Sequence, residues 1–198
     1  IPAIAIIFFF YGRAYDMVVS YTIRQEQDRS AETAPLIEES IQKVLDVSEE
    51  ISSLDFYQTL FKNAITDSFT DLAVSPDAAS FSQKVDQLIT GTPVTNVKIY
   101  MEVPKDSPSD INALLNKEDL KDTFLSLDQV RGTYWYGIFR GSRVSQLFCP
   151  SFYLGTKEQK AYGDQAYITH ASVIYNNGTY DAYMAVYYSG HDFPVSYT

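Results

Sequence analysis

One arginine and a run of aromatic residues form the stretch of this chain best suited to hold a small molecule. Residues 130–139 read Val-Arg-Gly-Thr-Tyr-Trp-Tyr-Gly-Ile-Phe and contain the only tryptophan, Trp135, between Tyr134 and Tyr136. A cation, Arg131, precedes them. Aromatic residues favour strands and the first glycine favours a turn, so we expect a loop that enters a strand. Such a strand is either plain core or the wall of a pocket in which aromatic faces and one cation hold a ligand.

Tyrosine is unusually frequent, with 16 residues against 12 Phe and 1 Trp. A tyrosine joins an apolar ring to a hydroxyl, which suits half-wet surfaces and sites for polar ligands. Strand-rich domains also use tyrosine well. Composition therefore leaves a ligand site and an ordinary sheet as equal interpretations.

No residue pattern predicts catalysis. His170 lies between Thr169 and Ala171 in an expected strand, where a hydrogen-bonded histidine of the fold is the simpler interpretation. Cys149 precedes a proline and is expected to be a small buried hydrophobe. The spacings of zinc proteases and of hydrolase nucleophile elbows are both missing from the sequence. We predict no catalytic residue, no metal site and no cofactor.

Net charge excludes one class of partner. The formal charge is -10, whereas nucleic acid needs a basic face, so we predict no nucleic-acid binding. A hydrophobic content of 45% over 198 residues supports a real core. The single cysteine excludes an internal disulfide.

The first residues predict contact with a membrane. Residues 1–10 are apolar throughout but too few to span a bilayer, which takes roughly 20 residues in a helix. We expect residues 1–12 to be the end of a transmembrane helix that leaves the membrane near Tyr11 and Arg13. The alternative is the buried start of a soluble helix.

Residues 13–60 predict a long helix. Apolar residues recur in heptad register, which predicts a seam that packs along a twin helix in a homodimer or along the same domain. Pro35 is expected to kink or interrupt this helix. The seam residues are Ile37, Val44, Val47, Ile51 and Leu54.

The remaining pattern predicts two short helices and then a sheet. The helices are expected at 56–66 and from Ser75-Pro76 to Ile89, with Ser75 as N-cap. Residues 94–103 alternate with period two, so Val97, Ile99 and Met101 face one way and Asn96, Lys98 and Tyr100 the other. A helical crossover at 111–130 leads to further strands. We expect these strands at 130–139, 144–154, 166–175 and 180–189, with a turn at 140–143 and an Asn-Gly hairpin at 176–179.

This order resembles the PAS-like extracytoplasmic sensor domains of the Cache family. The sensor regions of YesM-type membrane histidine kinases are similar over nearly the whole chain. The matching segments are the apolar start followed by Tyr and Arg, Ala-Pro-Leu-Ile-Glu-Glu-Ser-Ile at 34–41, Asn-Val-Lys-Ile-Tyr at 96–100 and Ala-Tyr-Met-Ala-Val-Tyr-Tyr-Ser at 182–189. The resemblance implies an α+β fold, with a long N-terminal helix and a five-stranded antiparallel sheet flanked by helices, and a sensor module over residues 61–198.

The resemblance also implies a function. The chain is expected to be the extracytoplasmic ligand-sensing domain of a two-component histidine kinase, at the cell membrane. A carbohydrate-related nutrient signal would pass through the long helix to a kinase core that this chain does not contain. The implied partners are a small-molecule ligand or a solute-binding protein, a second copy through the N-terminal helix, and a cytoplasmic response regulator. The alternatives are the ligand-binding domain of a chemoreceptor and a non-signalling membrane-anchored binding module.

The resemblance finally suggests site residues. Double-Cache sensors of amino acids use an Arg before a Trp-Tyr pair for the carboxylate and an Asp on a later strand for the ammonium. This sequence has Arg131, Trp135, Tyr136 and Asp181, but Arg131 stands four residues before Trp135 where that pattern has two. The candidate ligand-binding residues are Arg131, Trp135, Tyr136, Tyr100, Asp181 and Tyr183.

Overall fold

The computed structural model describes residues 35–62, 64–65, 68–104 and 108–190. The expected membrane segment at 1–12 and the first part of the expected long helix, 13–34, lie outside these residues. Within the described part of the chain, no helix has both the length and the apolar character needed to cross a membrane.

The N-terminal helix covers residues 35–53 and packs on its own domain. It is interrupted at Leu54 before helix α2 (Asp55–Phe61) begins, so the continuous helix expected up to residue 60 is broken there. Val44, Val47 and Ile51 are buried in the core of the same chain. This part of the heptad seam therefore has a partner within the domain, and the homodimer stays a prediction.

Three further helices lie between α2 and strand β3 (Phe124–Ser126). They are α3 (Phe69–Ala73), α4 (Pro76–Ile89) and α5 (Pro108–Leu115). The start of α4 is confirmed, because the Ser75 side chain accepts a hydrogen bond from the Ala78 backbone N–H and Pro76 is the first helical residue.

The sheet has six strands and is mixed rather than antiparallel. The strand order is β1-β5-β6-β2-β3, with β5 and β6 inside the sheet. Strand β1 pairs with the end of β5, and β4 pairs with residues near the start of β5. Strand β3 runs parallel to β2, and β1 runs parallel to β5. The purely antiparallel sheet is therefore a wrong prediction, because these two short strands were not anticipated. The strands are β1 (Ala64–Ile65), β2 (Val94–Met101), β3 (Phe124–Ser126), β4 (Gln146–Cys149), β5 (Gln165–Tyr175) and β6 (Gly178–Tyr188).

The longest pairing is the predicted hairpin of β5 and β6. Asn176 and Asn177 adopt φ of 47° and 61°, the left-handed conformation that asparagine tolerates in a two-residue turn. Register runs from Tyr175 opposite Gly178 to Gln165 opposite Tyr188. The hairpin therefore spans the whole length of the sheet.

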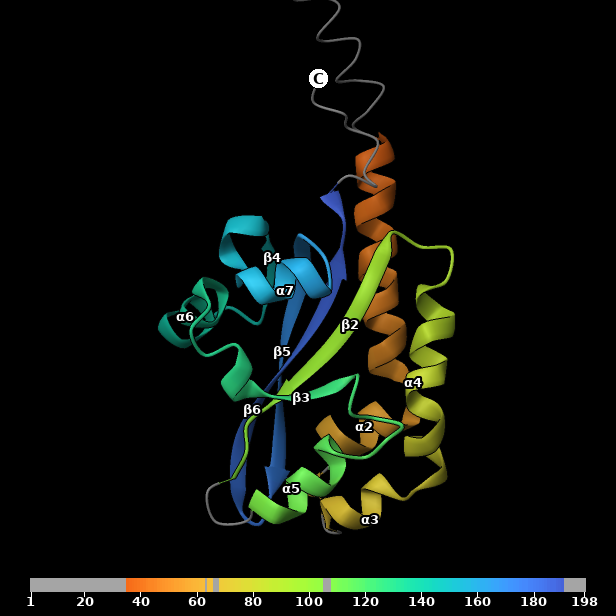
Figure 1. Cartoon of the computed structure of the whole chain (residues 1–198), viewed down its shortest axis with the longest axis vertical. Coiled ribbons are helices and arrows are strands. Elements are labelled where there is room, and N and C mark those ends of the chain that lie inside the picture. Colours follow the sequence, from red (N-terminus) through yellow and green to blue (C-terminus); the bar gives the residue numbers. More distant parts are fainter. Residues whose placement is uncertain (1–34, 63, 66–67, 105–107, 191–198) are drawn as a thin grey trace, which may run out of the picture.

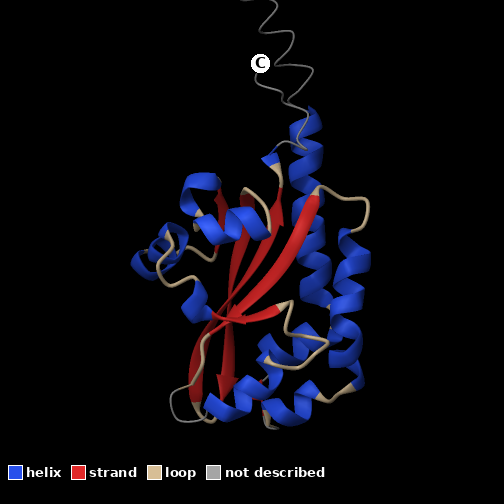
Figure 2. Ribbon diagram, viewed as in Figure 1, coloured by secondary structure: helices blue, strands red, loops and turns tan. Residues whose placement is uncertain are grey.

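Helices cover both faces of the sheet, as Figures 1 and 2 show. One face packs on the N-terminal helix and α4. Val97, Ile99 and Met101 of β2 point into the core on this face, as their alternation in the sequence predicts. The opposite face is covered by α6 (Tyr134–Gly141) and α7 (Thr156–Ala161), with the short 3-10 turns η1 (Leu127–Gln129) and η2 (Ser151–Tyr153) beside them. Tyr100 faces this second core. The α+β class with a helix-flanked sheet is confirmed.

The aromatic residues of the stretch 130–139 begin a helix, α6, and not the expected strand. Thr133 caps α6 by accepting a hydrogen bond from the Tyr136 backbone N–H. Trp135, Tyr136 and Phe139 share one buried face at helical spacing, whereas Tyr134 is 64% exposed. The cap and the spacing thus outweigh the strand preference of aromatic side chains.

The strand expected at 144–154 is shorter than predicted. It is confined to β4, Gln146–Cys149, and pairs only with β5 among the described strands. Pro150 follows it and precedes η2. Since proline has no N–H to donate to a ladder, it ends this edge strand instead of bulging it.

Candidate functional site

An open cavity of about 330 Å³ lies where α6 ends above the sheet. Its lining comes from three places in the sequence: the end of α6 with the segment that leads to β4, strand β5 and strand β6. Backbone pairing fixes this junction, because the His170 N–H of β5 donates to the Ser145 carbonyl at 2.8 Å. The lining residues are Phe139, Arg140, Ser142, Arg143, Val144, Ser145, His170, Asp181 and Tyr183.

A histidine–aspartate pair lies in the cavity wall. The His170 Nε2 atom is 2.9 Å from Asp181 Oδ1, and both side chains are about one-third exposed, at 32% and 29%. Arg140 reaches the other oxygen of the same carboxylate, with its Nη1 atom 3.7 Å from Oδ2. The charge of Asp181 is therefore already partly offset by the protein.

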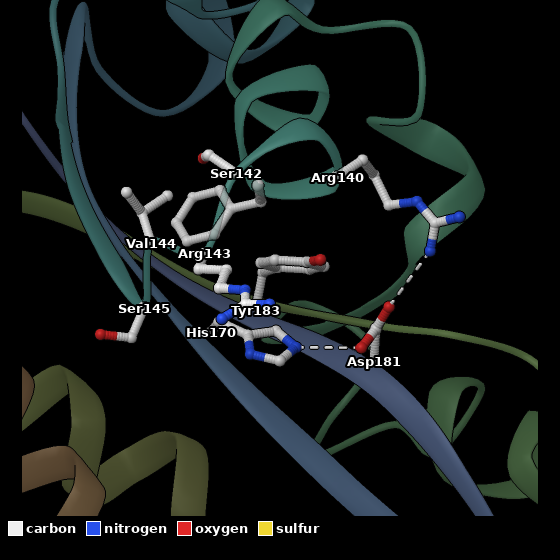
Figure 3. Close-up of a pocket in the computed structure, with 9 residues that line it drawn as sticks. Arg140, Ser142, Arg143, Val144, Ser145, His170, Asp181 and Tyr183 are labelled. Atoms are coloured by element: carbon white, nitrogen blue, oxygen red, sulfur yellow. Dashed lines mark hydrogen bonds and ion pairs between the residues drawn. The ribbon is translucent and has the colours of Figure 1, made fainter.

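The second arginine of the cavity has no such partner. The side chain of Arg143 forms no ion pair or hydrogen bond with any residue that the structure describes. Figure 3 shows Arg140 and Arg143 approaching the His170–Asp181 pair from opposite sides. A guanidinium without a fixed partner keeps its planar set of donors available for a ligand.

Tyr183 forms the floor of the cavity. It is 2% exposed and its ring lies against Phe139, with 5.1 Å between centroids, and against His170, also at 5.1 Å. Burial raises the pKa of the Tyr183 hydroxyl well above its ordinary value of 10, and the negative charge of Asp181 raises it further. The hydroxyl therefore stays protonated at neutral pH.

Net charge distinguishes this cavity from the rest of the molecule. Two arginines and one aspartate leave a net charge of +1 with His170 neutral, in a chain whose formal charge is -10. Arg140 and Arg143 are also two of only three arginines in the described residues. The cavity can attract an anion despite the acidity of the chain.

Two of the six sequence-predicted ligand residues, Asp181 and Tyr183, line this cavity. Arg131 lies outside it and is engaged by Asp128, whose Oδ1 is 2.6 Å from Nε, and by Glu102 at 3.6 Å. Its Nη1 also donates to the Tyr136 hydroxyl at 3.0 Å. The Arg-before-Trp-Tyr pattern thus builds a surface ion cluster here.

Trp135 and Tyr100 belong to a buried hydrogen-bond network around Glu158. The Tyr187 hydroxyl donates to Glu158 Oε1 at 2.5 Å, and the Trp135 indole N–H donates to both carboxylate oxygens at 3.3 and 3.4 Å. Tyr187 has one hydroxyl hydrogen, so Tyr100, whose oxygen is 2.8 Å away, must donate to it. Trp135 is fully buried and Tyr100 is 1% exposed, which places both in the core.

Two predictions about reactive residues are confirmed. His170 is hydrogen-bonded in a strand, as its sequence context indicated. Cys149 is buried without exposed area, and burial raises the pKa of its thiol to about 12, which keeps it protonated and unreactive. Among the described residues, no group of His, Cys, Asp and Glu side chains is placed to hold a metal ion.

Arg140 and Arg143 line the cavity but were not predicted to do so. The segment 140–143 was expected only as a turn, although it carries two arginines in an acidic chain. That concentration of positive charge was the available signal. Their approach to His170 and Asp181 depends on the pairing of β4 with β5, which local patterns do not reveal.

Comparisons with known proteins identify no relative. The chain matches no family model, no curated protein and no solved structure.

Proposed function

We propose that this chain is the extracytoplasmic ligand-sensing domain of a two-component sensor histidine kinase, and that the cavity at the end of α6 is its ligand site. The observation that carries the proposal is the position of the cavity on the central strand β6. Asp181 and Tyr183 line the cavity, while Ala182 and Met184, between and beyond them, belong to the core that contains the N-terminal helix.

Strand β6 thus touches both the cavity and the core of the opposite face. Successive residues of a strand point to opposite faces of the sheet. A tilt or shift of the strand that moves the side chains on one face therefore also moves those on the other face. Ligand contact at Tyr183 would therefore bias how Met184 packs in the core that also holds Val47 and Ile51 of the N-terminal helix. Such a bias is all that a two-state sensor needs.

The N-terminal helix and β6 run in opposite directions. The described start of the helix and the end of β6 lie at the same end of the molecule (Figure 1). In the proposal this end faces the membrane, and the signal passes through the helix to a kinase core outside this chain and then to a response regulator. A chemoreceptor would use the same domain with a different output module.

Indirect sensing has its own supporting observation. Tyr134 and Phe152 are 64% and 72% exposed, and both rings contact Tyr153, with centroids 4.7 and 4.5 Å from it. Exposed aromatic clusters are enriched where proteins dock. A solute-binding protein seated on this patch would deliver the nutrient signal without a ligand in the cavity.

Direct sensing is tested by thermal unfolding of the chain against sugars, oligosaccharides, amino acids and organic acids. A ligand at a hundredfold excess over its dissociation constant stabilises the folded state by about 2.7 kcal/mol. For a domain of this size we expect the melting temperature to rise by about 5–10 °C. A flat response to every class, followed by capture of a ligand-loaded solute-binding protein by the chain, would favour indirect sensing instead.

A further inference from the structure

The charge of the cavity narrows the chemistry of its ligand. We propose that the cavity binds a small organic anion bearing a carboxylate, which Arg143 and Arg140 hold above the ring of Tyr183. This inference rests on the proposed function, because it names the class of compound that the same site recognises. It excludes neutral sugars and zwitterionic amino acids as the cognate ligand.

Arg143 is available to bind a carboxylate. Its guanidinium lines the cavity and has no partner among the described residues, whereas Arg131 is fixed by two carboxylates and a tyrosine hydroxyl. A carboxylate can accept two parallel hydrogen bonds from such a planar fork. Binding there costs the protein no existing ion pair.

Asp181 is poorly placed to receive an ammonium group. In a site for a zwitterion, a carboxylate is needed to meet the ammonium group. Asp181 is instead hydrogen-bonded by His170 at 2.9 Å and paired with Arg140 at 3.7 Å, so its carboxylate is already engaged before any ligand arrives. Two arginines against one engaged aspartate favour a ligand with net negative charge over one with no net charge.

The remaining lining residues would contact the part of the ligand that is not the carboxylate. The lining also contains Ser142, whose hydroxyl donates to the Ile138 carbonyl at 2.6 Å and keeps its own acceptor lone pairs, together with Ser145 and the rings of Phe139 and Tyr183. Hydroxyl groups can donate and accept, and an aromatic ring offers a flat apolar surface. With a volume of about 330 Å³, near the lower end of the range for small-molecule sites, the cavity suits a compact hydroxylated acid such as a sugar acid.

The test compares glucuronate with glucose, which share a ring and differ in the carboxylate. Succinate, citrate, inorganic phosphate and alanine complete the set of probes, and affinity is measured by titration calorimetry on the full 198-residue chain. We expect glucuronate or another of the carboxylates to bind and glucose and alanine to bind at least tenfold more weakly. Affinity should fall as salt is raised, because the partly exposed arginines are screened.

Three variants locate the binding. Arg143→Ala should weaken carboxylate binding by about tenfold or more, since a hydrogen bond to a charged group is lost from an open site. Arg143→Lys, which keeps the charge without the fork, should recover part of the loss. Lys157→Ala removes one exposed positive charge outside the cavity lining and should leave the affinity unchanged.

Asp181→Asn gives a result of opposite sign for the two ligand classes. Removing the only carboxylate of the lining should strengthen binding of an anion by several fold, whereas it would weaken binding of an amino acid through its ammonium group. Melting temperatures of the variants control for folding, and the Arg143 side chain has no described ion pair or hydrogen bond to lose.

Each other outcome counts against a defined part of the proposal. Binding of glucose or alanine alone overturns the anion inference and leaves the sensor function standing. Preference for phosphate over every carboxylate, or carboxylate binding that Arg143→Ala does not affect, also overturns the inference. Absence of binding by all probe classes overturns direct sensing at this cavity, and the anion inference with it.

Discussion

Glu158 is a single residue that holds two helices to the sheet. Its carboxylate accepts hydrogen bonds from Trp135 of α6, from Tyr187 of β6 and from the Gly155 backbone N–H before α7, the last at 2.7 Å. The residue is 5% exposed, and no described buried side-chain polar atom lacks a partner. A buried carboxylate is tolerated here because three donors converge on it.

We expect Glu158→Ala to lower the free energy of unfolding by about 2–4 kcal/mol, because the indole N–H and the Tyr187 hydroxyl lose their acceptor in a buried position. Glu158→Gln keeps one acceptor oxygen and should cost less. Chemical denaturation followed by circular dichroism measures both. The matched control is Glu118→Ala, whose 83% exposed side chain pairs only with Lys121 and should change stability by less than about 1 kcal/mol. Equal effects at the two positions would contradict the role of the network.

Residue types alone were a poor guide to the site. Trp135 and Tyr136 have the composition of a pocket wall, yet both are buried in α6, and Arg131 beside them is occupied by Asp128. The residues that line the cavity come from the end of α6, the segment that leads to β4 and the strands β5 and β6, and only Asp181 and Tyr183 among them were candidates. Polar and charged side chains form a site only when the fold places them next to one another and leaves some of them without a partner inside the protein. The sequence alone shows neither their proximity nor their partners.

At the scale of elements, strongly patterned segments were predictable. The alternation of β2, the Ser75 cap of α4 and the tight hairpin between β5 and β6 each have a local physical cause, and each is found, although the turn residues are Asn176 and Asn177 rather than an Asn-Gly pair. Strands β1 and β3 escaped prediction because two or three residues are too short to show a period. Both pair in parallel with distant segments, so their existence depends on tertiary contacts.

Asp110 of α5 joins this helix to α3 and to β5 through hydrogen bonds. Its carboxylate, on α5, accepts hydrogen bonds from the backbone N–H groups of Phe69 and Thr70 at the start of α3, both at 3.0 Å, and from the Tyr175 hydroxyl of β5 at 2.6 Å. Burial alone would raise the pKa of Asp110, but hydrogen bonds from Tyr175 and from Thr70 and Phe69 lower it below its ordinary value of 3.8.

This lowered pKa predicts acid sensitivity. A carboxyl group whose native pKa is below its unfolded value contributes stability above that unfolded value and loses it as pH falls through the native pKa. We expect Asp110→Asn to be less stable than the natural chain at pH 7, with a difference that shrinks as pH falls below 3.8. Denaturation curves from pH 7 to about pH 2.5 measure this. Asp119→Asn, at an exposed carboxylate without a described side-chain hydrogen bond, serves as control, and a difference that persists at the lowest pH would refute the linkage.

At the scale of the whole molecule, the sheet separates two cores. One contains the N-terminal helix, α2 and α4, and the other contains α6 and the aromatic network around Glu158. The cavity lies on the second side and the proposed output helix on the first. In the proposed function the signal would therefore cross the sheet, in which the strands β2, β5 and β6 each contribute side chains to both cores.

Assembly is the remaining prediction at this scale. Val47 is buried in the domain, whereas Leu36 on the same helix is 47% exposed. If the homodimer forms through the N-terminal helix, we expect Leu36→Asp to reduce self-association in sedimentation velocity while the melting temperature stays within about 2 °C. Val47→Asp should instead unfold the domain, since it buries an unpaired charge. A chain that stays monomeric at every concentration would count against the dimer.

The position of Trp135 has a consequence for optical measurements. Its ring lies edge-on to that of Tyr183, with 5.5 Å between centroids, and Tyr183 forms the floor of the cavity. Since this is the only tryptophan in the sequence, indole fluorescence has a single source, one side chain away from the proposed ligand. The chain carries its own spectroscopic label for the cavity, so occupancy can be followed in solution without attaching a dye.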